Sequence, residues 1–99
     1  MKSELVKNNL GTYFEDPLLF TPDLFLDERG FFMESWNKKT FNQLTNKEIN
    51  FVQDNHSKSR KNVIRGLHYQ LHPFSQGKLV RCISGKIYDV LVDLRQNSK

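Results

Sequence analysis

The sequence contains a single cysteine, Cys82, and no apolar run long enough to cross a membrane. One cysteine cannot form a disulfide within the chain, which indicates a reducing, cytoplasmic setting. A membrane-spanning helix needs about 18 or more apolar residues, and residues 1–10 carry charges where a signal peptide would have its apolar segment. We therefore expect neither export nor a membrane anchor. Because Cys82 lies in an apolar stretch, we expect it to be a small core residue.

Internal repeats, low-complexity tracts and Pro/Gly-rich linkers are also missing, and the three prolines are scattered. A chain of 99 residues has room for one domain, so we expect residues 1–99 to belong to a single domain. A chain this short buries only about 60–65% of the surface that its unfolded form exposes. It therefore depends on a dense core or on a partner.

Charge is unevenly distributed along the chain. Residues 1–36 contain three basic and seven acidic residues, a net charge of −4, whereas residues 37–99 contain twelve basic and four acidic residues, a net charge of +8. A basic half is typical of proteins that bind nucleic acid or anionic metabolites, and also of ordinary solvated surfaces. A β-sheet that binds nucleic acid would place aromatic residues beside the basic ones. Here most aromatics lie in the acidic third, away from the basic residues 58–61, so we expect no nucleic-acid partner.

Most of the sequence has the residue pattern of short β-strands. Alternating or strand-favouring runs predict strands at residues 31–36, 50–56, 63–70, 78–83 and 86–94. The first follows a predicted turn at residues 27–30, and Ser84-Gly85 suits a hairpin between the last two. Strands at this density predict an all-β sandwich or barrel.

The only helix that the sequence predicts is a short one near residues 40–46. Thr40 is a candidate N-cap, and Phe41 and Leu44 are spaced to face the core together. The pattern ends at Asn46, after barely two turns. We therefore expect at most one short helix in an otherwise all-β chain.

Residues 63–85 (VIRGLHYQLHPFSQGKLVRCISG) concentrate basic and titratable side chains. Strand alternation places His68 on the same face as Gly66, and a glycine within a strand often marks a bulge, which would let Arg65 and His68 point to the same side. An arginine, a histidine and Lys78 converging on one pocket would suit an anionic ligand and proton transfer. Taken alone, a histidine in such a strand is more often a packed core residue than a functional one.

A metal site is not expected, although His68 and His72 are four residues apart, because that spacing suits a helix and the surrounding pattern is that of a strand. The segment resembles the first conserved motif of the cupin barrel: a glycine, two closely spaced histidines, a glutamate and a second glycine. Lys78 stands seven residues before Gly85, where that motif has the glutamate, and no second histidine follows His68 by two. The resemblance therefore implies a metal-free cupin.

Three longer motifs narrow this resemblance to one family. They are DERGFFMESWN (residues 27–37), FVQDNHSKSRKNVIRGLHYQ (residues 51–70) and QGKLVRCISGKIYDVLVDLR (residues 76–95). In this order and spacing, over about residues 17–99, the chain resembles the N-terminal half of the dTDP-4-dehydrorhamnose 3,5-epimerase family. The resemblance implies a cupin-type jelly-roll barrel, incomplete in this short chain. It also implies an isomerase of dTDP-L-rhamnose and polysaccharide biosynthesis, a homodimer that needs no cofactor.

The resemblance also assigns roles to residues. The family epimerises C3 and C5 of the nucleotide sugar dTDP-4-keto-6-deoxyglucose by removing a proton beside the keto group and returning it to the other face. His68 matches the general base, and Lys78 matches the lysine that stabilises negative charge on the C4 oxygen. The positions that match substrate-binding residues are Arg29 and Arg65 for the diphosphate, Phe31 for the thymine, and Glu34, Gln53, Asp54 and Asn55.

Two other interpretations stay open. In the family, the tyrosine that reprotonates the sugar and the aspartate that pairs with the catalytic histidine lie in the C-terminal half, beyond the position of Lys99. The alternatives are a related nucleotide-sugar-binding cupin, such as a 3- or 5-epimerase or a ketoisomerase, and a catalytically inactive fragment. An incomplete sheet would expose unpaired edges and an apolar face, which predicts dimerisation or poor solubility.

Overall fold

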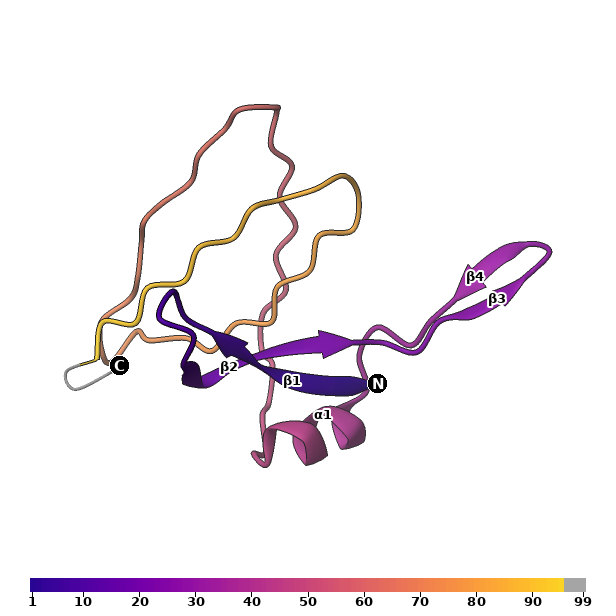
Figure 1. Ribbon diagram of the computed structural model, residues 1–99, viewed down its shortest axis with the longest axis horizontal. Coiled ribbons are helices and arrows are strands. Elements are labelled where there is room, and N and C mark those ends of the chain that lie inside the picture. The colour runs from indigo at the N-terminus through magenta and orange to yellow at the C-terminus, as the bar shows by residue number, and fades with distance from the viewer. Residues whose placement is uncertain (96–99) are drawn as a thin grey trace. The chain divides into compact units, whose positions relative to one another are not determined.

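The structure, a computed structural model, describes residues 1–95. The described residues divide into two compact units, residues 1–54 and residues 55–95. The helix and strands of the described residues all lie in the first unit (Figure 1): β1 (Lys2–Lys7), β2 (Tyr13–Thr21), β3 (Phe25–Asp27), β4 (Gly30–Phe32) and α1 (Lys38–Thr45). They form two antiparallel hairpins and one short helix, which agrees with the expected all-β chain of partial cupin type.

The first hairpin, β1–β2, closes through a polar turn. Leu5 pairs with Leu18, and the ladder has an irregularity before Lys7. Asn8 organises the turn, because its side-chain Oδ1 accepts the backbone N–H of Thr12 (3.0 Å) and its backbone N–H donates to the Thr12 carbonyl (2.7 Å). The sequence pattern does not predict this hairpin, since charged residues interrupt the apolar alternation of both strands.

Helix α1 begins one residue after its N-cap, Asn37. The Asn37 side chain accepts the backbone N–H of Thr40 (3.1 Å), which satisfies one of the donors that a helix leaves open at its start. The helix ends at Asn46, whose left-handed backbone (φ 53°, ψ 34°) lets its N–H donate to the Gln43 carbonyl (3.3 Å). The predicted short helix near residues 40–46 is therefore confirmed. The prediction that Thr40 caps it is wrong, because the helix begins at Lys38 and Thr40 lies within its first turn.

An aromatic cluster forms the core of the first unit. Phe41 is the only buried hydrophobic residue among the described residues, at 5% exposure. Its ring centroid lies 5.1 Å from that of Phe20 on β2, 5.5 Å from Phe51 and 6.3 Å from Trp36, while Leu44 is only half-buried. The rings are tilted or edge-on to one another, the arrangements that aromatic pairs favour. The cluster ties β2, the residues before and after α1, and α1 itself together.

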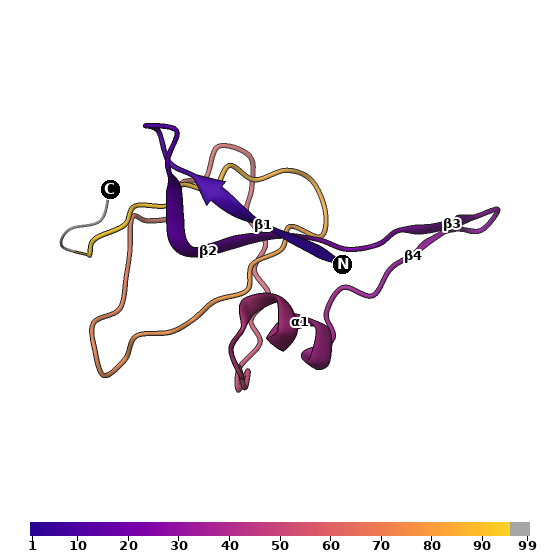
Figure 2. The ribbon, with the colours of Figure 1, turned by 60° about the horizontal axis from the view of Figure 1, so that its bottom comes forward.

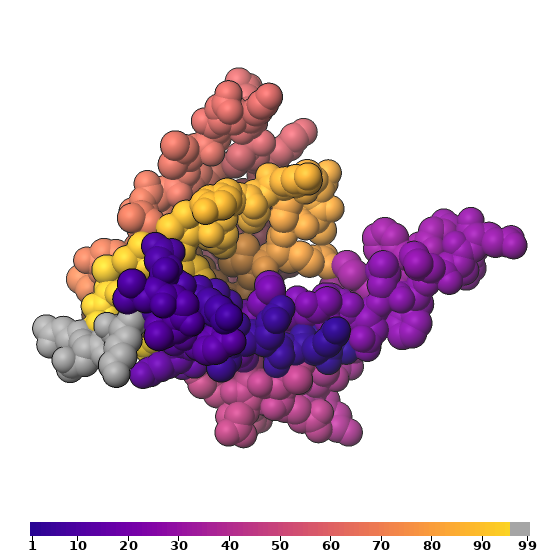
Figure 3. Space-filling view, in the orientation of Figure 1, coloured from indigo at the N-terminus to yellow at the C-terminus, as the bar shows by residue number. Residues whose placement is uncertain are grey.

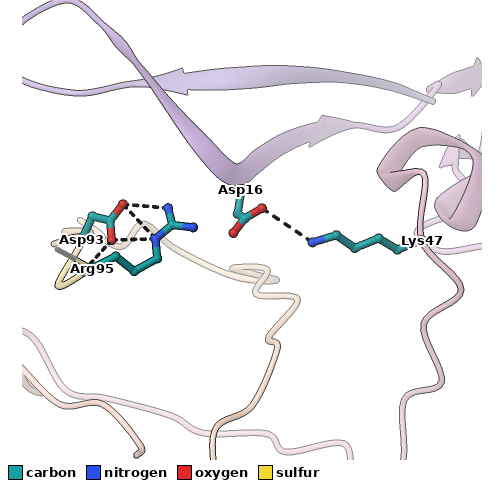
Figure 4. A network of polar contacts seen from close by, with 4 residues as sticks. All are labelled: Asp16, Lys47, Asp93 and Arg95. Atoms are coloured by element: carbon teal, nitrogen blue, oxygen red, sulfur yellow. Dashed lines mark hydrogen bonds and ion pairs between the residues drawn. The ribbon is translucent and has the colours of Figure 1, made fainter. Parts of the chain in front are cut away.

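One ion pair also connects β2 to the segment after α1. Lys47 Nζ lies 3.6 Å from Asp16 Oδ1 (Figure 4), and both side chains are largely exposed. Pairs of this kind contribute between zero and about 1 kcal/mol because water screens them. The aromatic cluster, and not this pair, holds α1 against β2.

The second hairpin, β3–β4, turns through Glu28 and Arg29, so that Asp27 pairs with Gly30. The predicted turn at residues 27–30 is confirmed, and Gly30 supplies the positive φ (129°) that the turn requires. Within the predicted strand at residues 31–36, pairing ends at Phe32, because its partner strand begins at Phe25.

The side chains of this second hairpin are exposed on both strands. Phe25, Leu26, Phe31 and Phe32 are between 61% and 76% exposed. The hairpin extends beyond β1–β2 and α1 of the same unit as a narrow arm (Figures 2 and 3). It therefore depends on its own turn for order and not on the aromatic cluster.

A carboxylate fixes the turn of this arm. The backbone N–H of Arg29 donates to Asp27 Oδ1 (2.8 Å), and its Nη2 donates to Asp27 Oδ2 (2.7 Å). The guanidinium of Arg29, and then its backbone N–H, holds the pKa of Asp27 below its ordinary value of 3.8. Both bonds favour the charged carboxylate.

The second unit contains no helix or strand within residues 55–95. The segments predicted as strands, from residue 50 onward, are extended coil without ladder hydrogen bonds. Backbone bonds close only two turns there, from Val63 to Arg60 (3.4 Å) and from Phe74 to Leu71 (2.7 Å). A strand forms only where a neighbouring segment supplies N–H and C=O partners, and no described segment supplies them.

Apolar side chains of the second unit are exposed for the same reason. Ile64 is 91% exposed, and Cys82 is exposed with its Sγ donating to the Ser84 carbonyl (3.3 Å). The expectation that Cys82 is a core residue is therefore wrong, because no second layer covers its segment. Arg95 donates from Nε and Nη2 to Asp93 (3.0 and 2.7 Å, Figure 4), a local pair like that of Arg29.

Within residues 1–95, no helix has both the length and the apolar character needed to cross a membrane.

Replacing Phe41 with alanine should destabilise the first unit. Truncating a buried phenylalanine costs about 3–5 kcal/mol, and here it also removes the ring on which three others pack. Urea unfolding followed by Trp36 fluorescence measures the loss. Phe32→Ala, on the exposed arm, is the matched control and should leave the midpoint nearly unchanged. Equal midpoints for the two variants would contradict the assigned core.

Replacing Arg29 with alanine should raise the pKa of Asp27 toward its ordinary value. The variant removes the guanidinium bond, which lowers this pKa most, and keeps the backbone N–H. Because the pKa is lowered in the folded hairpin, the stabilisation is present above pH 3.8 and is lost as the pH falls through the folded pKa. Carboxyl NMR titration measures the shift. Arg95→Ala should leave Asp27 unchanged, and an unshifted Asp27 in the Arg29 variant would contradict the pairing.

Candidate functional site

The candidate residues are divided between the two units. The first unit contains Arg29, Phe31, Glu34, Gln53 and Asp54, and the second contains Asn55, Arg65, His68 and Lys78. All nine are exposed. The structure therefore describes two groups of candidate residues, each with its own local geometry.

In the first unit, two candidate residues lie on the β3–β4 arm. Arg29 lies in the turn with its guanidinium held by Asp27, and Phe31 follows on β4 opposite Leu26. Glu34 lies beyond the end of β4. An exposed aromatic ring is suited to contact a flat base, and a guanidinium is suited to contact an anionic group.

In the second unit, the ring of His68 lies directly over Gly66. A Cβ built on Gly66 would come within 3.1 Å of His68 Nδ1 and 3.7 Å of Cε1, and the φ of Gly66 is +107°. Only glycine combines this backbone with this close approach. This close approach was not predicted, because strand alternation only places Gly66 and His68 on one face. The alternative of a packed core histidine is wrong, because His68 is exposed.

Arg65 is held by the preceding loop. Its Nε donates to Ser59 Oγ (2.9 Å) and its Nη2 to the Lys58 carbonyl (3.3 Å). In the part of the chain that the structure describes, no hydrogen bond or ion pair joins Arg65, His68 and Lys78 to one another. The expected bulge at Gly66 does not form, since residues 63–70 have no partner strand, and Arg65 takes its partners from the loop instead.

The described residues contain no group of three or more His, Cys, Asp or Glu side chains placed to hold a metal ion. The chemistry that the residues offer is that of an accessible imidazole, an amine and two guanidinium groups. Groups of these kinds bind negatively charged ligands and transfer protons.

Two residues that bind the candidate arginines Arg29 and Arg65 were not predicted from the sequence. Asp27 binds Arg29 from two positions away, and an Asp-x-Arg sequence before a turn glycine is a signal that could have found it. Ser59 binds Arg65 from six positions away. No sequence pattern marks that pair, because it depends on the turn between them.

Comparison with known proteins identifies the family. The family model described as dTDP-4-dehydrorhamnose 3,5-epimerase matches residues 11–99. Proteins named dTDP-4-dehydrorhamnose 3,5-epimerase are similar to the chain. The one from Shigella flexneri is 57% identical over 91 residues, which are 92% of this chain and 50% of that protein. The one from Salmonella typhimurium is 55% identical over 89 residues, which are 90% of this chain and 49% of that protein.

The Escherichia coli K12 protein of the same name is 50% identical over 91 residues, 92% of this chain and 49% of that protein. No solved structure matches the chain significantly. The chain spans about half the length of the curated relatives that it matches. The resemblance found in the three sequence motifs is confirmed, and the chain belongs to the dTDP-4-dehydrorhamnose 3,5-epimerase family.

Proposed function

We propose that this chain carries the base-bearing part of a dTDP-4-dehydrorhamnose 3,5-epimerase site. Its substrate is the nucleotide sugar dTDP-4-keto-6-deoxyglucose, and residues 1–99 belong to one cupin domain of a cytoplasmic homodimer. The observation that supports this most is the family match over residues 11–99. The relatives at 50–57% identity carry the same enzyme name.

His68 is the proposed general base. Hydrogens at C3 and C5 flank the C4 carbonyl, so removal of either gives an enolate, and return of the proton to the opposite face inverts the centre. Histidine titrates near neutral pH, so an imidazole can accept this proton and be regenerated. The imidazole of His68 is exposed and lies over Gly66, which leaves its outer face open to a substrate.

Lys78 is the proposed electrostatic partner of the reaction. As the enolate forms, negative charge develops on the C4 oxygen, and a positioned ammonium group stabilises that charge more than it stabilises the ketone. Arg29 and Arg65 hold the diphosphate, and Phe31 packs on the thymine. The remaining substrate contacts are assigned to Glu34, Gln53, Asp54 and Asn55.

Proton removal and inversion are separate steps of the proposed reaction. A base alone exchanges the proton beside the keto group with solvent, whereas inversion needs a donor on the opposite face. Solvent exchange therefore reports on the base alone.

When the chain is incubated with dTDP-4-keto-6-deoxyglucose in deuterated water, the C5 or C3 hydrogen should exchange with solvent deuterium. Proton NMR measures this exchange. His68→Ala should slow this exchange at least about a hundredfold, because a general base contributes 10²–10⁴-fold. His72→Ala is the matched control, an exposed histidine four residues further on. No exchange by the wild type would refute catalysis by this chain, and full exchange by the His68 variant would refute the base.

Gly66→Ala should slow the same exchange by about tenfold or more. The new methyl group would lie 3.1 Å from Nδ1 of His68, on a backbone (φ +107°) that alanine rarely adopts, so the imidazole must move. Gly77→Ala is the control, since a Cβ there meets no atom within 4 Å. If both variants exchange at the wild-type rate, the position of the imidazole over Gly66 is not needed for proton removal.

A further inference from the structure

The guanidinium of Arg65 is held along one edge only. Its Nε and Nη2 face Ser59 Oγ and the Lys58 carbonyl, at 2.9 and 3.3 Å. A guanidinium carries five N–H donors in a fixed plane. The two bonds use one donor on each of these nitrogens, so both donors of Nη1 and the second donor of Nη2 stay available. These form a fork of the kind that binds an anion through two parallel hydrogen bonds.

Both acceptors that hold Arg65 are uncharged. The contrast within the same chain is Arg29, whose guanidinium is paired with the carboxylate of Asp27 at 2.7 Å. A carboxylate fixes an arginine and also cancels its charge, whereas a hydroxyl and a carbonyl fix it and leave the charge intact. Arg65 therefore keeps its full attraction for an anion.

A tight turn creates this arrangement. The Val63 N–H donates to the Arg60 carbonyl (3.4 Å), and Asn62 has a left-handed backbone (φ 69°) at the third position of the turn, where turns that need a positive φ favour glycine or asparagine. The turn returns the chain so that Arg65 meets Ser59 within the second unit. The loop also carries Lys58, Arg60 and Lys61, which add positive potential nearby.

We propose that Ser59 is a positioning residue, which holds Arg65 so that its open fork is presented to the diphosphate of the nucleotide sugar. This inference rests on the proposed function, in which Arg65 holds the diphosphate. An arginine side chain that is already ordered loses less conformational entropy when the anion binds. Ser59 thus increases affinity without touching the ligand.

Calorimetric titration of the full 99-residue chain with dTDP, and with inorganic pyrophosphate, tests the inference. Ser59→Ala should weaken binding of both probes about threefold to tenfold, the range that one hydrogen bond supports. Ser57→Ala is the matched control in the same loop and should bind as the wild type does. Ser59→Thr keeps the hydroxyl and should restore the affinity, which a loss of folding alone would not explain.

Two further variants distinguish the positioning of Arg65 from the neutralisation of its charge. Ser59→Asp keeps an acceptor for Nε but neutralises Arg65, so it should bind both probes more weakly than Ser59→Ala does. In an Arg65→Ala background, Ser59→Ala should have no further effect, because the residue that Ser59 positions is gone.

The outcomes distinguish the inference from the function on which it rests. If Arg65→Ala weakens binding but Ser59→Ala binds as tightly as the wild type, the positioning role is refuted and the proposed function stands. If Arg65→Ala binds as the wild type does, or if the wild type binds neither probe, the proposed role of Arg65 fails and the inference fails with it.

Discussion

The packing of Phe41 against three other aromatic rings is the interaction on which the ordered part of the chain depends. The rings come from β2, from the segment before α1, from α1 itself and from the segment that follows it. Residues distant in sequence are therefore joined by side chains and not by a shared sheet. Each small hairpin alone buries too little surface to be stable. The core of four rings is where the helix and the hairpin bury apolar surface against each other.

Local features of the fold could be predicted from the sequence because they depend on neighbouring residues. The turn before β4 follows from an aspartate and a glycine three positions apart, and α1 follows from the spacing of Phe41 and Leu44 and the stop at Asn46. The strands expected between residues 63 and 94 depend on partners far along the chain. The alternation of apolar residues around Ile64 and Tyr88 favours a strand. A strand forms ladder hydrogen bonds only where a neighbouring strand pairs with it.

The candidate site could likewise be predicted only in part. Long motifs identified the family and the types of side chain at His68, Lys78, Arg29 and Arg65, because these are properties of the sequence itself. The partners of the two arginines were not predicted, and neither was the contact of the His68 ring with Gly66. Such contacts are set by turns a few residues long, whose backbone angles the sequence pattern specifies only in part.

The two Asp-x-Arg pairs, at Asp27 and at Asp93, each close over a separation of only two residues. Closing so short a loop costs little chain entropy, so the Asp27–Arg29 pair needs no contact with the aromatic core. During synthesis, β3, its turn and β4 leave the ribosome before Phe41 does. The Asp27–Arg29 pair at the tip of the arm can therefore form before the aromatic core is assembled.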